Sequence, residues 1–236
     1  MRTGRLVKLG LGLVLAVVLA LGLAQLVLPR IAAKAVKDRV SRYGEVRSVR
    51  VAAFPAVELL WGQAESVRVS AGALAVAPDE LVALLLEAGQ VGRLEVRASE
   101  VRVTDLHLGA GSLVLGAARL EKRGSAIHAS AVVTDGELDA ALPSGVTVRI
   151  VAGGGGELRV RVTGSLFGFS ATVDAVVRAV AGKLELVPSG SLLAGLGRMT
   201  IFDEPKLEIL GVQAQPQGGG DGRPRAWKLA IDARLR

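Results

Sequence analysis

Few residues in this 236-residue chain have the types and spacing that catalysis requires. His107 and His128 are the two histidines, and neither stands in the HxxxH or HExxH spacing of a zinc site. The chain has no cysteine and no G-x-S-x-G motif, which excludes thiolate ligands, cysteine nucleophiles and a serine nucleophile elbow. Asp203 and Glu204 form an acidic pair, but Pro205 follows them, so we interpret the pair as a solvated turn. We therefore expect no catalytic site, no metal site and no enzyme activity. A hydrolase or transferase with an unrecognised site is the alternative.

The glycine run at residues 153–156 lacks the context of a phosphate-binding loop. A P-loop needs a following helix and a Lys–Ser/Thr pair, whereas Gly156 leads into an alternating, strand-like segment. We interpret the run as a hairpin turn and expect no nucleotide or other cofactor. The net charge of +7 gives little support for a nucleic-acid partner, because the residues beyond position 30 carry 25 basic and 22 acidic side chains. Such a small excess suits weak attraction to an anionic membrane surface.

An uncharged apolar run from Leu9 to Leu28 dominates the N-terminal segment. As a helix these residues would extend about 30 Å, which matches the hydrocarbon core of a bilayer. Arg2, Arg5 and Lys8 precede the run, so the positive-inside rule places the N-terminus in the cytoplasm and the rest of the chain outside it. The run is longer than the apolar core of a cleavable signal peptide and ends without an A-x-A site, which favours a retained signal anchor. A cleaved signal and a buried helix of a soluble protein are the alternatives.

An amphipathic helix is predicted next, from Arg30 to Tyr43. Ile31, Val36 and Val40 recur on one face, and the charged residues fall on the other. Two roles remain open for this helix, namely a stalk that lies on the membrane surface and a helix that packs on the following domain. The domain organisation that we predict is a signal anchor or signal peptide (residues 1–29), this amphipathic helix or stalk (30–45) and one extracytoplasmic β-rich domain (46–236).

Alternation with a period of two replaces the helical period beyond residue 46, as in Leu94–Leu108 and Leu158–Val162. Such segments are typical of strands with one apolar face and one polar face. The alternation shifts phase near Ala98–Glu100, which predicts a bulge or a turn at that point. Arginines recur on the polar faces, either as solvated strand residues or as contacts for lipid phosphates: Arg68, Arg97, Arg102, Arg149, Arg159 and Arg161.

Two short apolar helices interrupt the strands. The segment Pro78–Gly89 begins with proline and acidic residues and carries leucines on more than one face, so we expect it to be buried on two sides. The segment Thr134–Pro143 is a shorter helix with Thr134 as its N-cap. Half of all residues are hydrophobic but only 3% are aromatic, so the core must be aliphatic. Together these features predict an α+β fold, in which a strongly curved antiparallel sheet wraps the short helices and leaves an apolar groove.

The stretch Phe54–Val69, FPAVELLWGQAESVRV, contains a Phe-Pro pair, two leucines and a glycine, followed by alternating valines. Two segments that begin with Glu-Leu come after it, at Glu80–Leu85 and Glu137–Leu142. This order resembles the LmeA-like phospholipid-binding family over residues 31–215. The resemblance implies an exported or anchored envelope protein that binds phospholipid, including anionic phospholipid, and supports envelope lipid or glycolipid metabolism. The expected fold is compatible with a TULIP-like lipid-binding architecture.

A lipid groove in such a fold would be lined by the inward faces of the short helices and of the strands opposite them. Periodicity selects seven lining residues: Leu81, Leu84, Leu85, Leu138, Leu142, Phe167 and Phe169. Phe54 and Trp61 are further candidates, because amphipathic aromatic side chains suit the entrance of a lipid site. The alternative for these two residues is a core position in a corner of the sheet.

These patterns favour a non-enzymatic protein that binds phospholipid in an apolar groove and handles envelope lipid or glycolipid. Its expected partners are phospholipid and the membrane, with no nucleic acid, and no feature identifies a protein partner. The expected location is the cell membrane, with a single pass and the C-terminal domain outside the cytoplasm, or the envelope itself if the signal is cleaved. A scaffold module that assembles an envelope complex through its sheet edges is the alternative function.

Overall fold

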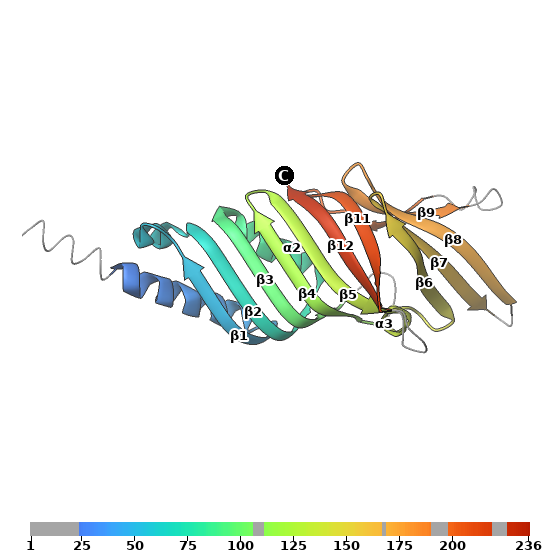
Figure 1. The fold of residues 1–236 in the computed structure, drawn as a ribbon, viewed down its shortest axis with the longest axis horizontal. Coiled ribbons are helices and arrows are strands. Elements are labelled where there is room, and N and C mark those ends of the chain that lie inside the picture. The colour runs from blue at the N-terminus through green and yellow to red at the C-terminus, as the bar shows by residue number, and fades with distance from the viewer. Residues whose placement is uncertain (1–23, 106–110, 167–168, 190–197, 219–225) are drawn as a thin grey trace, which may run out of the picture.

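The computed structural model describes residues 24–105, 111–166, 169–189, 198–218 and 226–236. Most of the apolar N-terminal run, His107 and Phe167 lie outside these residues, and for Phe169 only the backbone is described. The described strands form two sheets, which follow one another along the length of an elongated molecule (Figure 1).

The larger sheet contains seven strands in the order β1-β2-β3-β4-β5-β12-β11. Their bounds are β1 Gly44–Ala52, β2 Ala64–Val76, β3 Val91–Val103, β4 Leu113–Arg123, β5 Ala126–Thr134, β12 Ala226–Leu235 and β11 Leu207–Gln217. Neighbouring strands are antiparallel except for β2 and β3, which run parallel. The expectation of an antiparallel sheet is wrong for this pair, because a helical crossover between the two strands returns the chain to the edge where β2 began.

The smaller sheet contains five antiparallel strands in the order β10-β9-β8-β7-β6. Their bounds are β6 Val146–Gly154, β7 Glu157–Leu166, β8 Phe169–Val180, β9 Lys183–Ser189 and β10 Met199–Phe202. The predicted hairpin at the glycine run is confirmed, since Gly155 and Gly156 form the turn between β6 and β7 with φ angles of 65° and 84°. Glycine adopts this left-handed region without the steric penalty that a Cβ atom would introduce.

The helices begin where the sequence provides caps. The β2–β3 crossover consists of α2 (Pro78–Glu87) and η2 (Ala88–Gln90), and the Glu80 carboxylate accepts a hydrogen bond from Ala77 N at 3.2 Å. Thr134 caps α3 (Asp135–Ala140) as predicted, because its Oγ1 accepts from Glu137 N at 3.3 Å while Glu137 Oε2 accepts from Thr134 N at 2.6 Å. This reciprocal pair satisfies N–H groups that the first helical turn leaves without partners.

Two further helical segments lie at the β1 end of the molecule. The predicted amphipathic helix is present, covers residues 24–40 of the described chain, and packs Val36 and Val40 against valines of β1 and β2. Of the two roles that the sequence left open, the structure therefore shows packing on the domain for this part of the helix. The short helix η1 (Ala56–Trp61) connects β1 to β2.

The smaller sheet joins the larger one at the edge strand β11. Ile209 N donates a hydrogen bond to Gly182 O in the β8–β9 turn at 2.9 Å, and an apolar cluster that includes Trp227, Val160 and Val177 fills the space between the sheets. At Gly153 of β6 the backbones approach so closely that a Cβ atom would lie 2.5 Å from Ala214 O. The joint between the two sheets therefore depends on the absence of a side chain at position 153.

Replacing Gly153 with alanine should destabilise the protein by about 1–3 kcal/mol, which is the usual range for overpacking. The added methyl group would contact backbone atoms of β11, which cannot move without disturbing the ladder with β12. Urea unfolding of the full chain in detergent measures the effect. Gly164→Ala in β7 is the matched control, because a methyl group at that position would meet no atom of a non-adjacent residue within 4 Å. Equal stabilities of the two variants would contradict the close approach.

Candidate functional site

The seven-stranded sheet has one apolar face and one charged face. Residues that pair in register across the strands form rows, and two such rows on the apolar face are aliphatic at every position but one. The first row is Val51, Val67, Leu94, Lys122, Ile127, Ala233 and Ile209; the second is Val49, Val69, Val96, Leu120, Ala129, Ile231 and Val212. The row between them points to the opposite face and is Arg50, Arg68, Glu95, Glu121, His128 and Asp232. Because side chains alternate along a strand, matched registers separate an apolar from a charged face over this part of the sheet, with Lys122 as the exception.

Ion pairs hold the charged face together. The buried carboxylate of Glu95 accepts a hydrogen bond from Arg97 Nε at 2.7 Å and lies 3.4 Å from Arg119 Nη2 and 3.7 Å from Arg68 Nε. The hydrogen bond from Arg97 lowers the pKa of Glu95, and the charges of Arg97, Arg119 and Arg68 act in the same direction against the opposing effect of burial. His128 belongs to the same face, with its Nδ1 2.7 Å from Asp232 Oδ1.

Most of the arginines that recur on the polar strand faces are engaged in such pairs. Arg102 pairs with Glu100, Arg149 with Asp139 and Arg161 with Asp174, in addition to the contacts of Arg68 and Arg97 with Glu95. The structure therefore supports their interpretation as solvated strand faces with acidic partners.

Substituting Glu95 with glutamine should lower the free energy of unfolding by about 1–2 kcal/mol at neutral pH, as expected for hydrogen bonds to a charged group. Since the folded-state pKa of Glu95 is depressed, its contribution is present above the pKa of the unfolded chain and is lost as the pH falls through the folded-state pKa. The stability difference between wild type and variant should therefore shrink below about pH 4. Urea titrations at pH 7 and pH 3 measure it, with Glu65→Gln at an exposed position of β2 as the control. A difference that does not change with pH would contradict this account.

Three elements cover parts of the apolar face. The N-terminal helix lies over β1 and β2, α2 inserts Leu85 against Ile127 and Ala233, and the smaller sheet packs against β11 and β12. Figure 1 shows α2 behind β3 and β4 in the view in which the larger sheet faces the reader. At the margins of these covers, four consecutive members of the second row are only partly buried: Val96, Leu120, Ala129 and Ile231. We call these four residues the inner strip.

Lys122 is the one charged residue in the apolar rows, and it is completely buried. Its ammonium group donates hydrogen bonds to Val91 O at 2.9 Å and to Gly89 O at 3.4 Å, where the helical crossover enters β3. Burial lowers the pKa of Lys122. The side chain therefore fastens the crossover to β4 next to the inner strip. Sequence reasoning missed it, although its position two residues after Leu120 places it on the apolar face.

Of the nine predicted lipid-site residues, the structure describes the side chains of seven and distributes them over several places, while Phe167 and the side chain of Phe169 lie outside the described part of the chain. In α2, Leu85 is buried in the apolar face, Leu84 is half-buried and Leu81 is 40% exposed. Leu138 of α3 packs against the cluster between the sheets, and Leu142 is half-buried just after α3. The two helices lie apart along β5, because Leu85 of α2 packs against Ile127 near the start of this strand whereas α3 follows its last residue, Thr134 (Figure 1). Phe54 and Trp61 are exposed at the β1–β2 connection, away from the inner strip.

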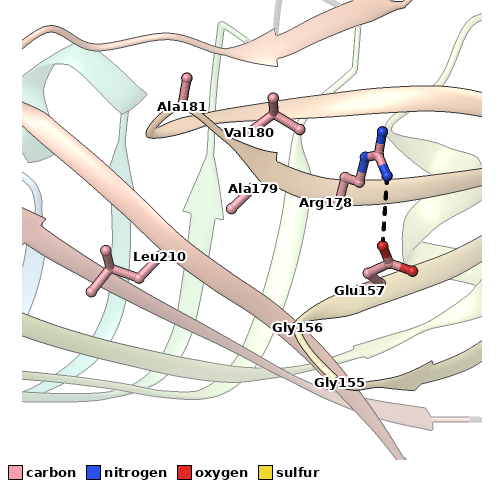
Figure 2. Close-up of a pocket in the computed structure, with 8 residues that line it drawn as sticks. All are labelled: Gly155, Gly156, Glu157, Arg178, Ala179, Val180, Ala181 and Leu210. Carbon is pink, nitrogen blue, oxygen red and sulfur yellow. Dashed lines mark ion pairs between the residues drawn. The ribbon is translucent and has the colours of Figure 1, made fainter.

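Two open cavities near the smaller sheet have a different chemical character. One of about 540 Å³ lies between the β6–β7 turn, the end of β8 and Leu210 of β11. Glu157 and Arg178 line it and form an ion pair at 3.8 Å, which Figure 2 marks with a dashed line. The other, of about 270 Å³, includes Lys183 and Asp203, whose side chains form an ion pair at 2.5 Å. Asp203 thus belongs to an ion-paired surface turn, in agreement with its interpretation from sequence. These polar linings do not suit an acyl chain.

The described residues place no three His, Asp or Glu side chains together as ligands for a metal ion. Within the same residues, no helix has the length and apolar character needed to cross a bilayer.

Comparison with known proteins identifies the family. No curated protein and no solved structure matches the chain. A family model described as LmeA-like phospholipid-binding matches residues 19–219, a range that contains every described strand except β12. This match confirms the resemblance carried by the Phe-Pro stretch and the Glu-Leu segments. Because it covers most of the chain, the protein belongs to the LmeA-like phospholipid-binding family.

Proposed function

We propose that the protein binds phospholipid on the apolar face of its larger sheet, with acyl chains lying along the inner strip beside α2. The observation that carries this proposal is the incomplete cover of Val96, Leu120, Ala129 and Ile231 within a row that is aliphatic across all seven strands. Strands lie about 4.8 Å apart, so the strip extends about 14 Å. Each methylene buried there would contribute about 0.8 kcal/mol.

The membrane location is also part of this proposal. The apolar run from Leu9 to Leu28 supports a signal anchor or signal peptide, and the basic residues before it support an extracytoplasmic domain. We place the protein at the cell membrane, or in the envelope if the segment is cleaved, where it handles lipid or glycolipid without catalysing a reaction. Membership of a phospholipid-binding family supports the lipid as ligand, and the excess of basic residues is compatible with anionic headgroups.

Native mass spectrometry of the detergent-solubilised full chain tests the proposal, together with organic extraction of the lipid that co-purifies. We expect phospholipid at a fixed ratio to protein. The extract also reports the headgroup, which separates anionic from zwitterionic ligands. A chain that stays free of lipid, and that takes up none from added phosphatidylglycerol or phosphatidylcholine vesicles, would instead favour a scaffold role through the sheet edges.

A further inference from the structure

Exposed large apolar side chains gather on two segments of the β1 end of the molecule. Phe54, Leu60 and Trp61 of the β1–β2 connection are 80%, 66% and 67% exposed. Leu26, Val27 and Ile31 are exposed on the first turns of the N-terminal helix. We call these six residues the apolar tip. The chain has only seven aromatic residues, so two exposed ones in a single short connection are unusual.

The β1–β2 connection presents its apolar residues from an ordered turn. Ala56 is completely buried, and Leu59 packs against the valine cluster of β1 and β2. Gly62 ends η1 with a left-handed φ of 75° and donates its N–H to Leu59 O at 3.1 Å. Leu59 is therefore directed inward while Leu60 and Trp61 are held outward. A turn anchored in this way keeps apolar side chains in contact with solvent, which is unfavourable unless another apolar phase covers them.

The two segments of the apolar tip lie at the same end of the molecule. The N-terminal helix runs antiparallel to β1, because only residues 41–43 separate them. From Val40 back to Ala24 the helix extends about 24 Å. This length nearly equals the rise of about 26 Å along β1. Leu26 and Val27 are therefore level with the end of β1, and Figure 1 shows the start of the helix and the connection after β1 at one end of the long axis.

The chemistry of the neighbouring chain indicates what covers the apolar tip. The uncharged run from Leu9 to Leu28 enters the described helix at this end, and Leu26 and Val27 are its last exposed members. Arg30 and Lys34 follow on the next turns and are exposed. This order matches the layers of a bilayer. The apolar side chains suit the acyl region, the tryptophan suits the interface, and the basic side chains that follow suit the lipid phosphates.

We propose that the apolar tip inserts into the interfacial region of the lipid bilayer, so that the larger sheet stands on the membrane by its β1–β2 end. This inference rests on the membrane location proposed above and adds the surface and the orientation. The apolar rows begin in β1 and β2 at this end and lead to the inner strip. The inserted end is therefore continuous with the surface that would take up lipid, and the smaller sheet lies at the far end of the molecule (Figure 1).

Site-specific fluorescence tests this orientation, because the absence of cysteine allows single labelling sites to be introduced in the full chain. Leu60→Cys and Val151→Cys are matched exposed apolar positions, the first in the apolar tip and the second in β6 of the smaller sheet. Each variant is labelled with a nitrobenzoxadiazole probe and reconstituted into vesicles of phosphatidylcholine and phosphatidylglycerol. Nitroxide groups on the lipid acyl chains then report contact with the bilayer, and iodide reports contact with water.

We expect nitroxide lipids to quench at least half of the probe emission at position 60 and little of that at position 151, with the opposite order for iodide. Equal quenching at both positions, or a probe at position 60 that iodide reaches freely, would overturn the inference. A position 60 shielded from iodide but not quenched by nitroxide lipids would also overturn it and indicate a protein partner. The lipid content of the same samples, measured by extraction, tests the proposed function separately, since quenching at position 60 does not require a lipid bound in the inner strip.

Discussion

Replacing Ala129 with phenylalanine should reduce phospholipid binding about tenfold or more while leaving the chain folded. Ala129 lies in the middle of the inner strip and pairs with Leu120 of β4 and Ile231 of β12. A benzyl group at this position would occupy the space along which an acyl chain runs, without introducing a polar atom. Loss of contact with two methylenes corresponds to about 1.6 kcal/mol. That is slightly more than a tenfold change in affinity.

Uptake of a fluorescent phosphatidylglycerol from vesicles by the delipidated full chain measures the effect. Ala171→Phe is the matched control, because it adds the same group at an exposed position of β8 in the smaller sheet. Ala129→Leu fills the strip less and should give an intermediate loss, which keeps the test informative if the larger substitution destabilises the fold. Unchanged uptake by an Ala129→Phe variant with a wild-type melting temperature would place the lipid away from the inner strip.

Replacing Lys122 with glutamate should destabilise the protein by about 3–5 kcal/mol, the range found when a buried charge is left without a partner. The ammonium group of Lys122 is the donor for Val91 O and Gly89 O, and a carboxylate in its place would face two acceptors. Because total stabilities are about 5–15 kcal/mol, the glutamate variant should be largely unfolded or show a much lower urea midpoint.

Lys122→Met is the matched control, since it keeps an unbranched chain of similar length. It removes the burial penalty of the charge but also leaves two carbonyl oxygens without this donor, so its net effect should stay within about 1 kcal/mol. Urea midpoints for the two variants measure the contrast. A glutamate variant as stable as the methionine variant would show that the side chain at position 122 reaches solvent.

The pH dependence gives a second readout for Lys122. Burial lowers its pKa in the folded state, so between the folded and unfolded pKa values the unfolded chain binds more protons. Below the folded-state pKa, the buried charge lowers the free energy of unfolding by its full desolvation cost. As the pH rises from the folded-state pKa to the pKa of the unfolded chain, the folded protein loses the charge and this cost decreases. Wild type should therefore gain stability relative to Lys122→Met between pH 7 and pH 10, measured by urea unfolding. A constant difference would contradict the lowered pKa.

Local patterns in the sequence determined most of the elements. The alternation through Leu94, Glu95 and Val96 defines two faces of β3 wherever that strand is placed, because successive side chains point to opposite sides. Thr134 and Glu137 form the predicted helix cap from residues only three positions apart. The change of phase near Ala98 is also seen in the burial pattern, since Ala98 is buried and Val101 and Val103 are half-buried on either side of the exposed Arg102. The predicted bulge or turn is wrong for β3, which runs unbroken and pairs in constant register with β2 and β4 through this point.

The family was likewise predicted from the chain, on the Phe-Pro pair and the Glu-Leu segments, and the family match over residues 19–219 confirms it. The candidate residues for the lipid surface were harder to select. Periodicity shows which side of α2 or α3 is apolar, but it does not show which apolar residues become core and which remain partly accessible. Leu85 became core, whereas Ala129 of the inner strip has no sequence feature that distinguishes it from other alanines.

Only the tertiary structure decided how the faces join. The continuous apolar rows depend on register between strands that are distant in sequence, as where Ile127 of β5 pairs with Ala233 of β12. Local periodicity in the sequence does not encode this register. It is set only when the C-terminal strand β12 pairs with the free edge of β5. The same closure separates α2 from α3, buries Lys122 beneath the crossover and leaves Phe54 and Trp61 exposed at one end. The sequence determined which residues prefer an apolar phase, and the long-range packing decided whether that phase is the protein core or remains available to lipid.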